Sequence, residues 1–430
     1  MYYEDSVIER STVNKLLWNL LPLLCLLSIG HVLDRLDLTY AAPNMDSALK
    51  LTSDEVRSTD TAFYLGWLVA GLPAAAGMLF IGARRWIAAI VIAWGVISMA
   101  QAVAWSVGSL EALRFLLGMA EANLMPAMVF FLAEWMPPRH RSLPIAVIVA
   151  AAALVPVIGE LLANLVQIVP ELLRISEWRW LFLVEGIPAV WLGMHVLDVL
   201  PQNPPEANFL PHPERHWLIM QLRDGARPPS ASRFRDGLLC MPNWKLAAAR
   251  VVAASVGASL GIWVPLAMQQ TDYLPPATGA EIMDGATVLG ALAALVCGLR
   301  WNNRLWLRRA LAMLLALAGI ALLSAALLAN ATAAVAMIAL VTFLMPPIVA
   351  LTWVLAPYLL AGSAAAAGFA LIGMAGALGN LGASILDAVR HDATIRCIIL
   401  AAACVVAAWL SLVMDRHRMT ETAASAPAGE

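Results

Sequence analysis

The chain has 430 residues, of which 61% are hydrophobic and 13% are charged, and its formal net charge is −2. A soluble domain carries about 25% charged residues, so this composition excludes an ordinary soluble domain and indicates a membrane protein. The small net charge gives no reason to expect a nucleic-acid partner. Five scattered cysteines form neither a disulfide framework nor a metal-ligand spacing, and no cofactor or metal is expected.

The N-terminal segment MYYEDSVIER lacks the basic start of a signal peptide, so the first apolar run is expected to remain as a helix. A helix crosses the bilayer with about 20 apolar residues. Stretches of that length recur twelve times, in two groups of six. They lie near 16–40, 61–81, 86–106, 110–134, 143–170 and 179–200, and then near 245–270, 284–300, 305–329, 331–356, 362–389 and 394–414.

The predicted fold is therefore an all-α integral membrane protein with two six-helix bundles, residues 1–200 and 245–415. A proline-rich, charged linker, 201–244, joins them, and 416–430 form a tail. With both termini, linker and tail in the cytoplasm, 18 of the 27 Lys and Arg residues fall on the inside and 6 on the outside. This bias follows the positive-inside rule, and two parallel repeats are typical of a transporter.

The first predicted helix carries a charged cluster within the stretch HVLDRLDLTYAAPNM. Helical periodicity places His31, Asp34 and Arg35 on one broad face. The cluster is either a solvated helix end or part of a protein interior. Pro43 is a natural helix end and would extend the helix to about Ala42, which favours the interior.

The fourth predicted helix has the clearest buried carboxylate, Glu121, which lies near mid-membrane by helical rise. Arg114 is seven residues earlier, hence on the same face, and the two are expected to pair. Ionisable residues at this depth cost about 2.5–3.5 kcal/mol each on insertion scales, which favours a proton relay or a substrate pathway over interhelical packing.

Three other helices carry polar residues at membrane depth. In the fifth, Glu160 and Asn164 begin a polar stripe that faces either a neighbouring helix or a cavity. In the eleventh, Asn380 lies among glycines at every third residue, a spacing that permits close helix approach. Arg250, in the seventh, is expected to extend to the cytoplasmic surface.

Four stretches resemble the anion:cation symporter branch of the major facilitator superfamily, which includes phthalate, tartrate and sugar-acid permeases. They are DRLDLTYAAPNM, RFLLGMAEANLMPAMVFFLAEWMPPRHRS, EWRWLFLVEGIPAVWLG with LPQNPPEANFL, and GFALIGMAGALGNLGA. The resemblance implies that Arg35 contacts a substrate carboxylate in a central cavity and that Asp34 and Glu121 are protonation sites. A guanidinium suits bidentate carboxylate binding, and burial disfavours the charged form of a carboxyl group.

The chain also departs from the pattern of this branch. Hydrogen-bonding residues expected there are replaced by Val32, Trp67, Gly71 and Gly376, and an expected Asn is Asp37. An apolar or aromatic carboxylate near Trp67 is therefore expected in preference to a sugar acid, since unpaired buried polar groups are costly. The added carboxylates Asp37 and Glu160 favour a monocarboxylate. GARRW and RWNNRLWLRR lack the acidic residue that these loops normally carry, which places normal gating in doubt.

The sequence thus predicts a monomeric inner-membrane transporter, not an enzyme, whose partners are a small organic anion, protons and the lipid bilayer. Arg35, Trp67, Asn380 and His31 are assigned to substrate, and Asp34, Glu121 and Arg114 to proton coupling; Asp37, Glu160 and Asn164 are cavity candidates. An exporter, a transport-inactive sensor or receptor, and a sodium-coupled symporter remain open. A membrane enzyme is the weakest alternative.

Overall fold

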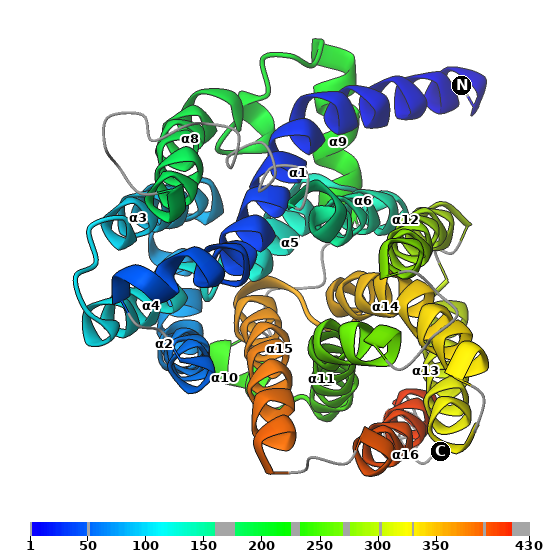
Figure 1. The fold of residues 1–430 in the computed structure, drawn as a ribbon. Coiled ribbons are helices and arrows are strands. Elements are labelled where there is room, and N and C mark those ends of the chain that lie inside the picture. Colours follow the sequence, from blue (N-terminus) through cyan, green and yellow to red (C-terminus); the bar gives the residue numbers. More distant parts are fainter. Residues whose placement is uncertain are drawn as a thin grey trace.

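The computed structural model describes residues 2–49, 52–159, 177–224, 233–269, 276–300, 303–328, 331–389 and 393–414, and it is built of helices (Figure 1). The first half contains α1 (Tyr2–Leu49), α2 (Ser53–Ile81), α3 (Ala83–Gln101), α4 (Val107–Glu121), α5 (Leu124–Trp135), α6 (Ser142–Ala153) and α8 (Glu177–Val199). The second half contains α11 (Met241–Gln269), α12 (Pro276–Arg300), α13 (Arg304–Leu327), α14 (Ala331–Leu359), α15 (Gly362–Val389) and α16 (Ala393–Leu412). Two short helices, α9 (His212–Asp224) and α10 (Phe234–Leu239), lie between the halves in sequence.

Within these described residues, eleven segments are long and apolar enough to cross a membrane, with α4 and α5 counted as one. They match the expected positions of the first six and last five spans. The 29-residue helix α11 occupies the position of the expected seventh span. The short eighth span is a 25-residue helix, α12. The all-helical membrane fold predicted from the sequence is confirmed.

Local sequence signals explain several helix boundaries. Thr52 begins α2 with a capping box, in which its hydroxyl accepts from the N–H of Glu55 and the Glu55 carboxylate accepts from the N–H of Thr52. Ser106 and Ser109 form the same reciprocal pair at the start of α4. Gly82 alone separates α2 from α3, and its φ of +84° is a backbone conformation that side chains rarely adopt.

One expected helix boundary is wrong. The first helix does not end near Ala42; α1 continues through Pro43 to Leu49. Proline is tolerated inside membrane helices, where neighbouring groups satisfy the freed backbone. The fourth span lies where it was expected but contains a break, because α4 ends at Glu121 and α5 begins at Leu124. Pro126 has no N–H to continue the α4 hydrogen-bond ladder, which accounts for a break at this position.

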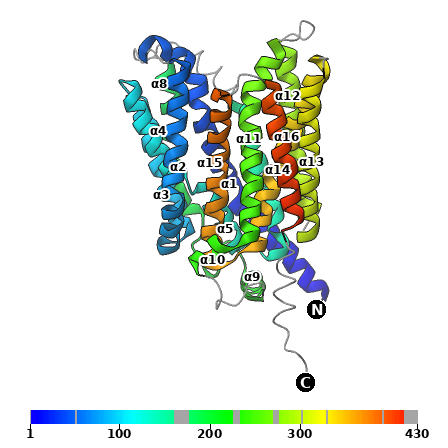
Figure 2. The ribbon, with the colours of Figure 1, turned by 90° about the horizontal axis from the view of Figure 1, so that it is seen from below.

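The helices run roughly parallel, and the start of α1, α9 and α10 lie at one end of the bundle, which we call the linker side (Figure 2). Helix α9 is tied to α1 there, because the Glu214 carboxylate accepts from Lys15 Nζ at 2.7 and 2.9 Å and from Ser11 Oγ at 2.8 Å. The contacts between the halves run through α2 with α15, α6 with α12 and α14, and α5 with α15.

Several contacts between the halves lie toward the linker side. Ser142, at the start of α6, shares a 3.2 Å hydrogen bond with the hydroxyl of Tyr358, near the end of α14. The rings of Phe130 and Phe369 meet edge to face with centroids 6.5 Å apart. Nearer the middle of the two helices, Gly71 of α2 leaves room for Met374 of α15, whose Cγ would lie 2.5 Å from an added Cβ. Small and aromatic side chains therefore close this side of the interface.

Candidate functional site

Arg35 of α1 lies inside an aromatic enclosure supplied by α2. The Arg35 guanidinium carbon lies 5.6 Å from the ring centroids of Tyr64 and Trp67 and 6.0 Å from that of Phe63. Its Nη2 donates to the Tyr64 hydroxyl at 3.0 Å. Such ring faces attract a guanidinium and fix its orientation. Among the described residues no carboxylate forms an ion pair with Arg35.

Two buried carboxyl groups lie beside Arg35. Asp34 is 1% exposed and Glu121 is fully buried. Glu121 Oε2 lies 3.0 Å from His31 Nδ1. The Asp34 carboxyl group is within electrostatic range of Glu121 and Arg114, and Ser98 and Trp94 of α3 face it. The two acids predicted for proton coupling are therefore brought together, with a histidine attached to one of them.

Arg114 has a different contact from the one expected. Its Nη1 donates to the backbone carbonyl of Asp34 at 3.4 Å, while Glu121 pairs with His31. Helix α4 packs against α2 and α3, and the long Arg114 side chain extends from it to the α1 backbone. Arg114 is 1% exposed, and Asp60 of α2 lies within electrostatic range of both Arg114 and Arg35.

The contact between His31 and Trp67 links the two buried acids, Asp34 and Glu121, to the aromatic enclosure of Arg35. Their ring centroids are 5.5 Å apart, and Trp67 is 6% exposed. The indole Nε1 of Trp67 is buried without a hydrogen-bond partner among the described residues. His31 therefore contacts both Glu121 and the ring that lines the predicted substrate position.

The residues of the second half considered for the site are Arg250, on α11, and Asn380, on α15. Arg250 was expected to extend to the membrane surface, and this expectation is wrong. Its guanidinium lies against Gly376 of α15, where an added Cβ would be 3.3 Å from Nη2, and it is within electrostatic range of Arg35. Asn380 is partly buried one turn along α15 from Gly376. The predicted close helix approach at the α15 glycines is present between α15 and α11, because an added Cβ at Gly379 would lie 2.3 Å from the Val251 carbonyl oxygen.

Three cavity candidates cannot be placed. Glu160 and Asn164 lie outside the described residues, and the side chain of Asp37 is outside them as well. The structure also reveals site residues that sequence reasoning missed. Asp60 and Tyr64 are one turn apart on α2 and face the same way as Trp67, a spacing that could have identified them.

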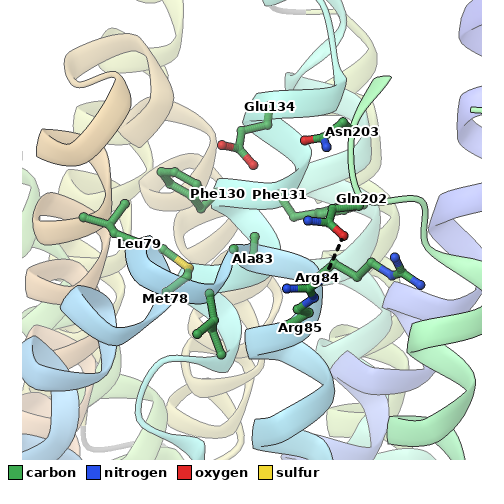
Figure 3. A pocket seen from close by; sticks show the side chains of 12 residues that line it. Met78, Leu79, Ala83, Arg84, Arg85, Phe130, Phe131, Glu134, Gln202 and Asn203 are labelled. Atoms are coloured by element: carbon green, nitrogen blue, oxygen red, sulfur yellow. Dashed lines mark hydrogen bonds between the residues drawn. The ribbon is translucent and has the colours of Figure 1, made fainter. Parts of the chain in front are cut away.

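A separate pocket lies on the linker side, at the turn between α2 and α3 (Figure 3). Glu134 at the end of α5 faces it, together with Arg84, Arg85 and Gln202. Arg85 Nη2 donates to Gln202 Oε1 at 3.4 Å, and Arg84 donates to the Leu197 carbonyl. These arginines are thus held by the end of α8 and the segment that follows it.

Comparison with known proteins places this architecture in a family. The model of the Major Facilitator Superfamily matches residues 24–384. A putative tartrate transporter of Agrobacterium vitis is 30% identical over 394 residues, covering 88% of this chain and 87% of that protein. A quinolone resistance transporter of Acinetobacter baumannii is 27% identical over 381 residues, covering 86% of each chain.

Solved structures show the same fold. The proton:xylose symporter XylE, bound to 6-bromo-6-deoxy-D-glucose, aligns with a TM-score of 0.74 at 12% identity, covering 93% of this chain and 95% of that one. The relatives and the family are transporters, and the predicted membrane transporter, as opposed to an enzyme, is confirmed. The chain belongs to the Major Facilitator Superfamily.

Proposed function

We propose that this transporter moves a small organic anion across the cell's inner membrane together with protons, by alternating access. The observation that carries the proposal is Arg35, a guanidinium held by aromatic rings and a hydroxyl, beside two buried carboxyl groups. A planar guanidinium binds a carboxylate with two parallel hydrogen bonds. The name of the tartrate transporter among its relatives supports an organic anion as the substrate class.

The walls around Arg35 support an apolar or aromatic body for this anion. Phe63, Tyr64 and Trp67 surround the guanidinium, and an aromatic ring prefers edge-to-face or offset contact with other rings. The Tyr64 hydroxyl and the Trp67 indole N–H supply two polar contacts. A carboxylate with few hydroxyl groups therefore suits this wall better than a sugar acid.

Asp34 and Glu121 are proposed as the proton-carrying groups, with His31 as the group that orients Glu121. Asp34 and Glu121 lie within electrostatic range of each other, and two like charges at such range disfavour simultaneous ionisation. An anion that arrives at Arg35 adds negative charge and favours the protonated forms further. Anion binding and proton binding would thereby promote each other.

The contacts between the halves support a conformation closed on the linker side. We propose that residues 1–200 and 245–415 move as two bundles around the site, and that the linker side is cytoplasmic, as the distribution of basic residues predicts. The structure would then represent an outward-facing state. The site alone does not favour import over export, since the same groups serve both.

Uptake into proteoliposomes tests the proposal. Protein with an inward proton gradient should accumulate a radiolabelled aromatic acid, and a proton ionophore should abolish the accumulation. Glu121→Gln should lose gradient-driven accumulation and retain exchange of external for internal substrate. The matched exposed variant Gln221→Glu, on α9, should behave as wild type.

Two other outcomes would each support a different function. Accumulation that requires a sodium gradient instead would replace protons by sodium as the coupling ion. Binding of the acid without any transport or exchange would indicate a sensor or receptor, the alternative favoured by the missing loop acids.

A further inference from the structure

The turn between α12 and α13 carries every basic residue of a long stretch of the second half. Residues 285–386 contain no Asp or Glu. Their basic residues, all close together at the end of α12 and the start of α13, are Arg300, Arg304, Arg308 and Arg309. The turn lies on the linker side, because an added Cβ at Gly298 of α12 would be 2.6 Å from Ala146 Cβ and 3.2 Å from the Ser142 carbonyl oxygen, near the start of α6.

The ionisable residues of the C-terminal tail do not neutralise these four charges. Helix α16 packs against α13, and residues 415–430, which follow α16 in the sequence, contain three acids and two arginines. Adding them to the turn leaves a net charge of +3. Arg300 and Arg309 are exposed, and neither forms an ion pair with a carboxylate in the described part of the chain. The turn is therefore a positively charged surface.

The corresponding turn of the first half, between α2 and α3, differs because its arginines have protein partners. Arg84 donates to a backbone carbonyl near the end of α8, and Arg85 donates to Gln202. Arg309 instead lies against the exposed ring of Trp306, with its guanidinium carbon 6.0 Å from the ring centroid. Tryptophan is enriched in membrane proteins at the level of the lipid headgroups. The contact with Trp306 therefore holds Arg309 at the depth of the lipid phosphates.

Each of the two exposed arginines lies at the linker-side end of an apolar helix face. Helices α12 and α13 are both long and apolar enough to span the membrane, and both pack against α14 on the outside of the second half (Figure 1). The exposed apolar side chains of α12 that lead to Arg300 are Leu289, Leu292, Val296 and Leu299. Those of α13 that continue from Arg309 are Met313, Leu317 and Ile320. The intervals of three and four residues place each set on one face of its helix.

We propose that the α12–α13 turn binds an anionic phospholipid, whose phosphodiester group contacts Arg300 and Arg309 and whose acyl chains lie along the exposed apolar faces of α12 and α13. Basic clusters next to a membrane helix attract anionic headgroups. A zwitterionic headgroup fits less well, because its ammonium group would meet four arginines in a stretch that contains no acid. A soluble phosphate would use the arginines but not the apolar faces. This surface lies outside the central site, so lipid binding here is independent of what the protein transports.

Native mass spectrometry of the purified full-length protein, titrated in detergent with dioleoyl phosphatidylglycerol or dioleoyl phosphatidylethanolamine, tests this site. Wild type should bind phosphatidylglycerol about tenfold more tightly, or better, because only this headgroup carries a net negative charge. The double variant Arg300→Gln, Arg309→Gln should weaken phosphatidylglycerol binding about 25-fold, which is about fivefold for each lost arginine, and should change phosphatidylethanolamine binding much less. The double variant Arg300→Lys, Arg309→Lys keeps both charges and should bind phosphatidylglycerol within about threefold of wild type, because a phosphate also accepts from an ammonium group.

A matched control removes the same charge elsewhere on the linker side. Arg223 and Arg235 are exposed on α9 and α10, and the double variant Arg223→Gln, Arg235→Gln should bind both lipids as wild type does. The Arg→Lys double variant separates loss of charge from loss of folding. sn-Glycerol 3-phosphate, a soluble part of the lipid, should not displace phosphatidylglycerol at millimolar concentration. Equal affinity of wild type for the two lipids, an equal loss in the α9–α10 control, loss of binding in the Arg→Lys double variant, or displacement by glycerol phosphate would each overturn the proposal.

Discussion

Gly118 of α4 and Gly66 of α2 face each other where the two helices cross, and neither position has room for a side chain. An added Cβ at Gly118 would lie 1.9 Å from the carbonyl oxygen of Phe63 and 3.1 Å from the backbone nitrogen of Trp67. An added Cβ at Gly66 would lie 2.0 Å from the carbonyl oxygen of Phe115. The helix backbones therefore touch directly behind the aromatic rings that enclose Arg35.

The substitution Gly118→Ala should move α2 away from α4. Ordinary contact begins at 3.4 Å, so the Phe63 carbonyl must retreat by about 1.5 Å, and it is backbone that cannot rotate away. Overpacking of this kind costs typically 1–3 kcal/mol. The shift would also carry the rings of Phe63 and Trp67 away from the guanidinium of Arg35, whose present distances are 6.0 and 5.6 Å. We expect a lower melting temperature and weaker binding together.

Gly108→Ala is the matched control, because Gly108 lies in the same helix and an added Cβ there meets no atom within 4 Å. Alanine is favoured over glycine in a helix by roughly 0.5–1 kcal/mol, so this control should be neutral or stabilising. Both variants are compared by thermal unfolding in detergent and by ligand affinity. A Gly118→Ala protein that has the same melting temperature as the Gly108→Ala control and binds substrate normally would refute the close helix crossing.

Three further predictions concern the site and its support. Arg35→Lys keeps the charge but loses the planar fork and the ring contacts, so substrate affinity should fall about tenfold or more; unchanged affinity in a binding assay would exclude the carboxylate clamp. The effects of His31→Gln and Glu121→Gln on stability should not be additive, because the two side chains are in contact. A double-mutant cycle measured by thermal unfolding should give a coupling energy of about 0.5–3 kcal/mol, and additive effects would contradict the pair. Glu214→Gln weakens the link from α9 to Lys15, whose side chain is 39% exposed, so the loss of unfolding free energy should be only about 1 kcal/mol; a loss of substrate affinity would show that α9 acts on the site.

Hydropathy and charge distribution were sufficient to predict most of the fold, because a membrane helix must be apolar over its full length. The turn between α2 and α3 and the start of α8 fall within a few residues of the expected positions. Boundaries set by local backbone chemistry were harder to predict. Pro43 does not end α1, whereas the fourth span is interrupted near Pro126. A proline in the sequence therefore does not by itself predict whether a helix is continuous or broken.

The site was predictable where one helix carried the signal and unpredictable where it required contacts between helices. Glu121 and Asp34 could be identified by their depth and by resemblance, but the partner of Glu121 is His31 on another helix, and spacing along one helix favoured Arg114 instead. Arg250 illustrates the same limit. Its place near the cytoplasmic end of a span suggested an exposed head group, and only the space at Gly376 of α15 shows why the guanidinium turns inward.

The loops without acidic residues raised doubt about gating, and the structure shows how the two arginines of the first of these loops are held. Arg84 and Arg85 are held by the Leu197 carbonyl and by Gln202, within the first half and the segment after α8. Among the described residues, contacts across the halves include Phe130 with Phe369, close approaches at small residues, and the hydroxyl pair of Ser142 and Tyr358. No ion pair between described residues therefore has to be broken across this interface for the linker side to open. If this side is closed in one state of the transport cycle, the described contacts that must separate are packing contacts and this hydroxyl pair, and ligands bound at the centre would shift the equilibrium against them.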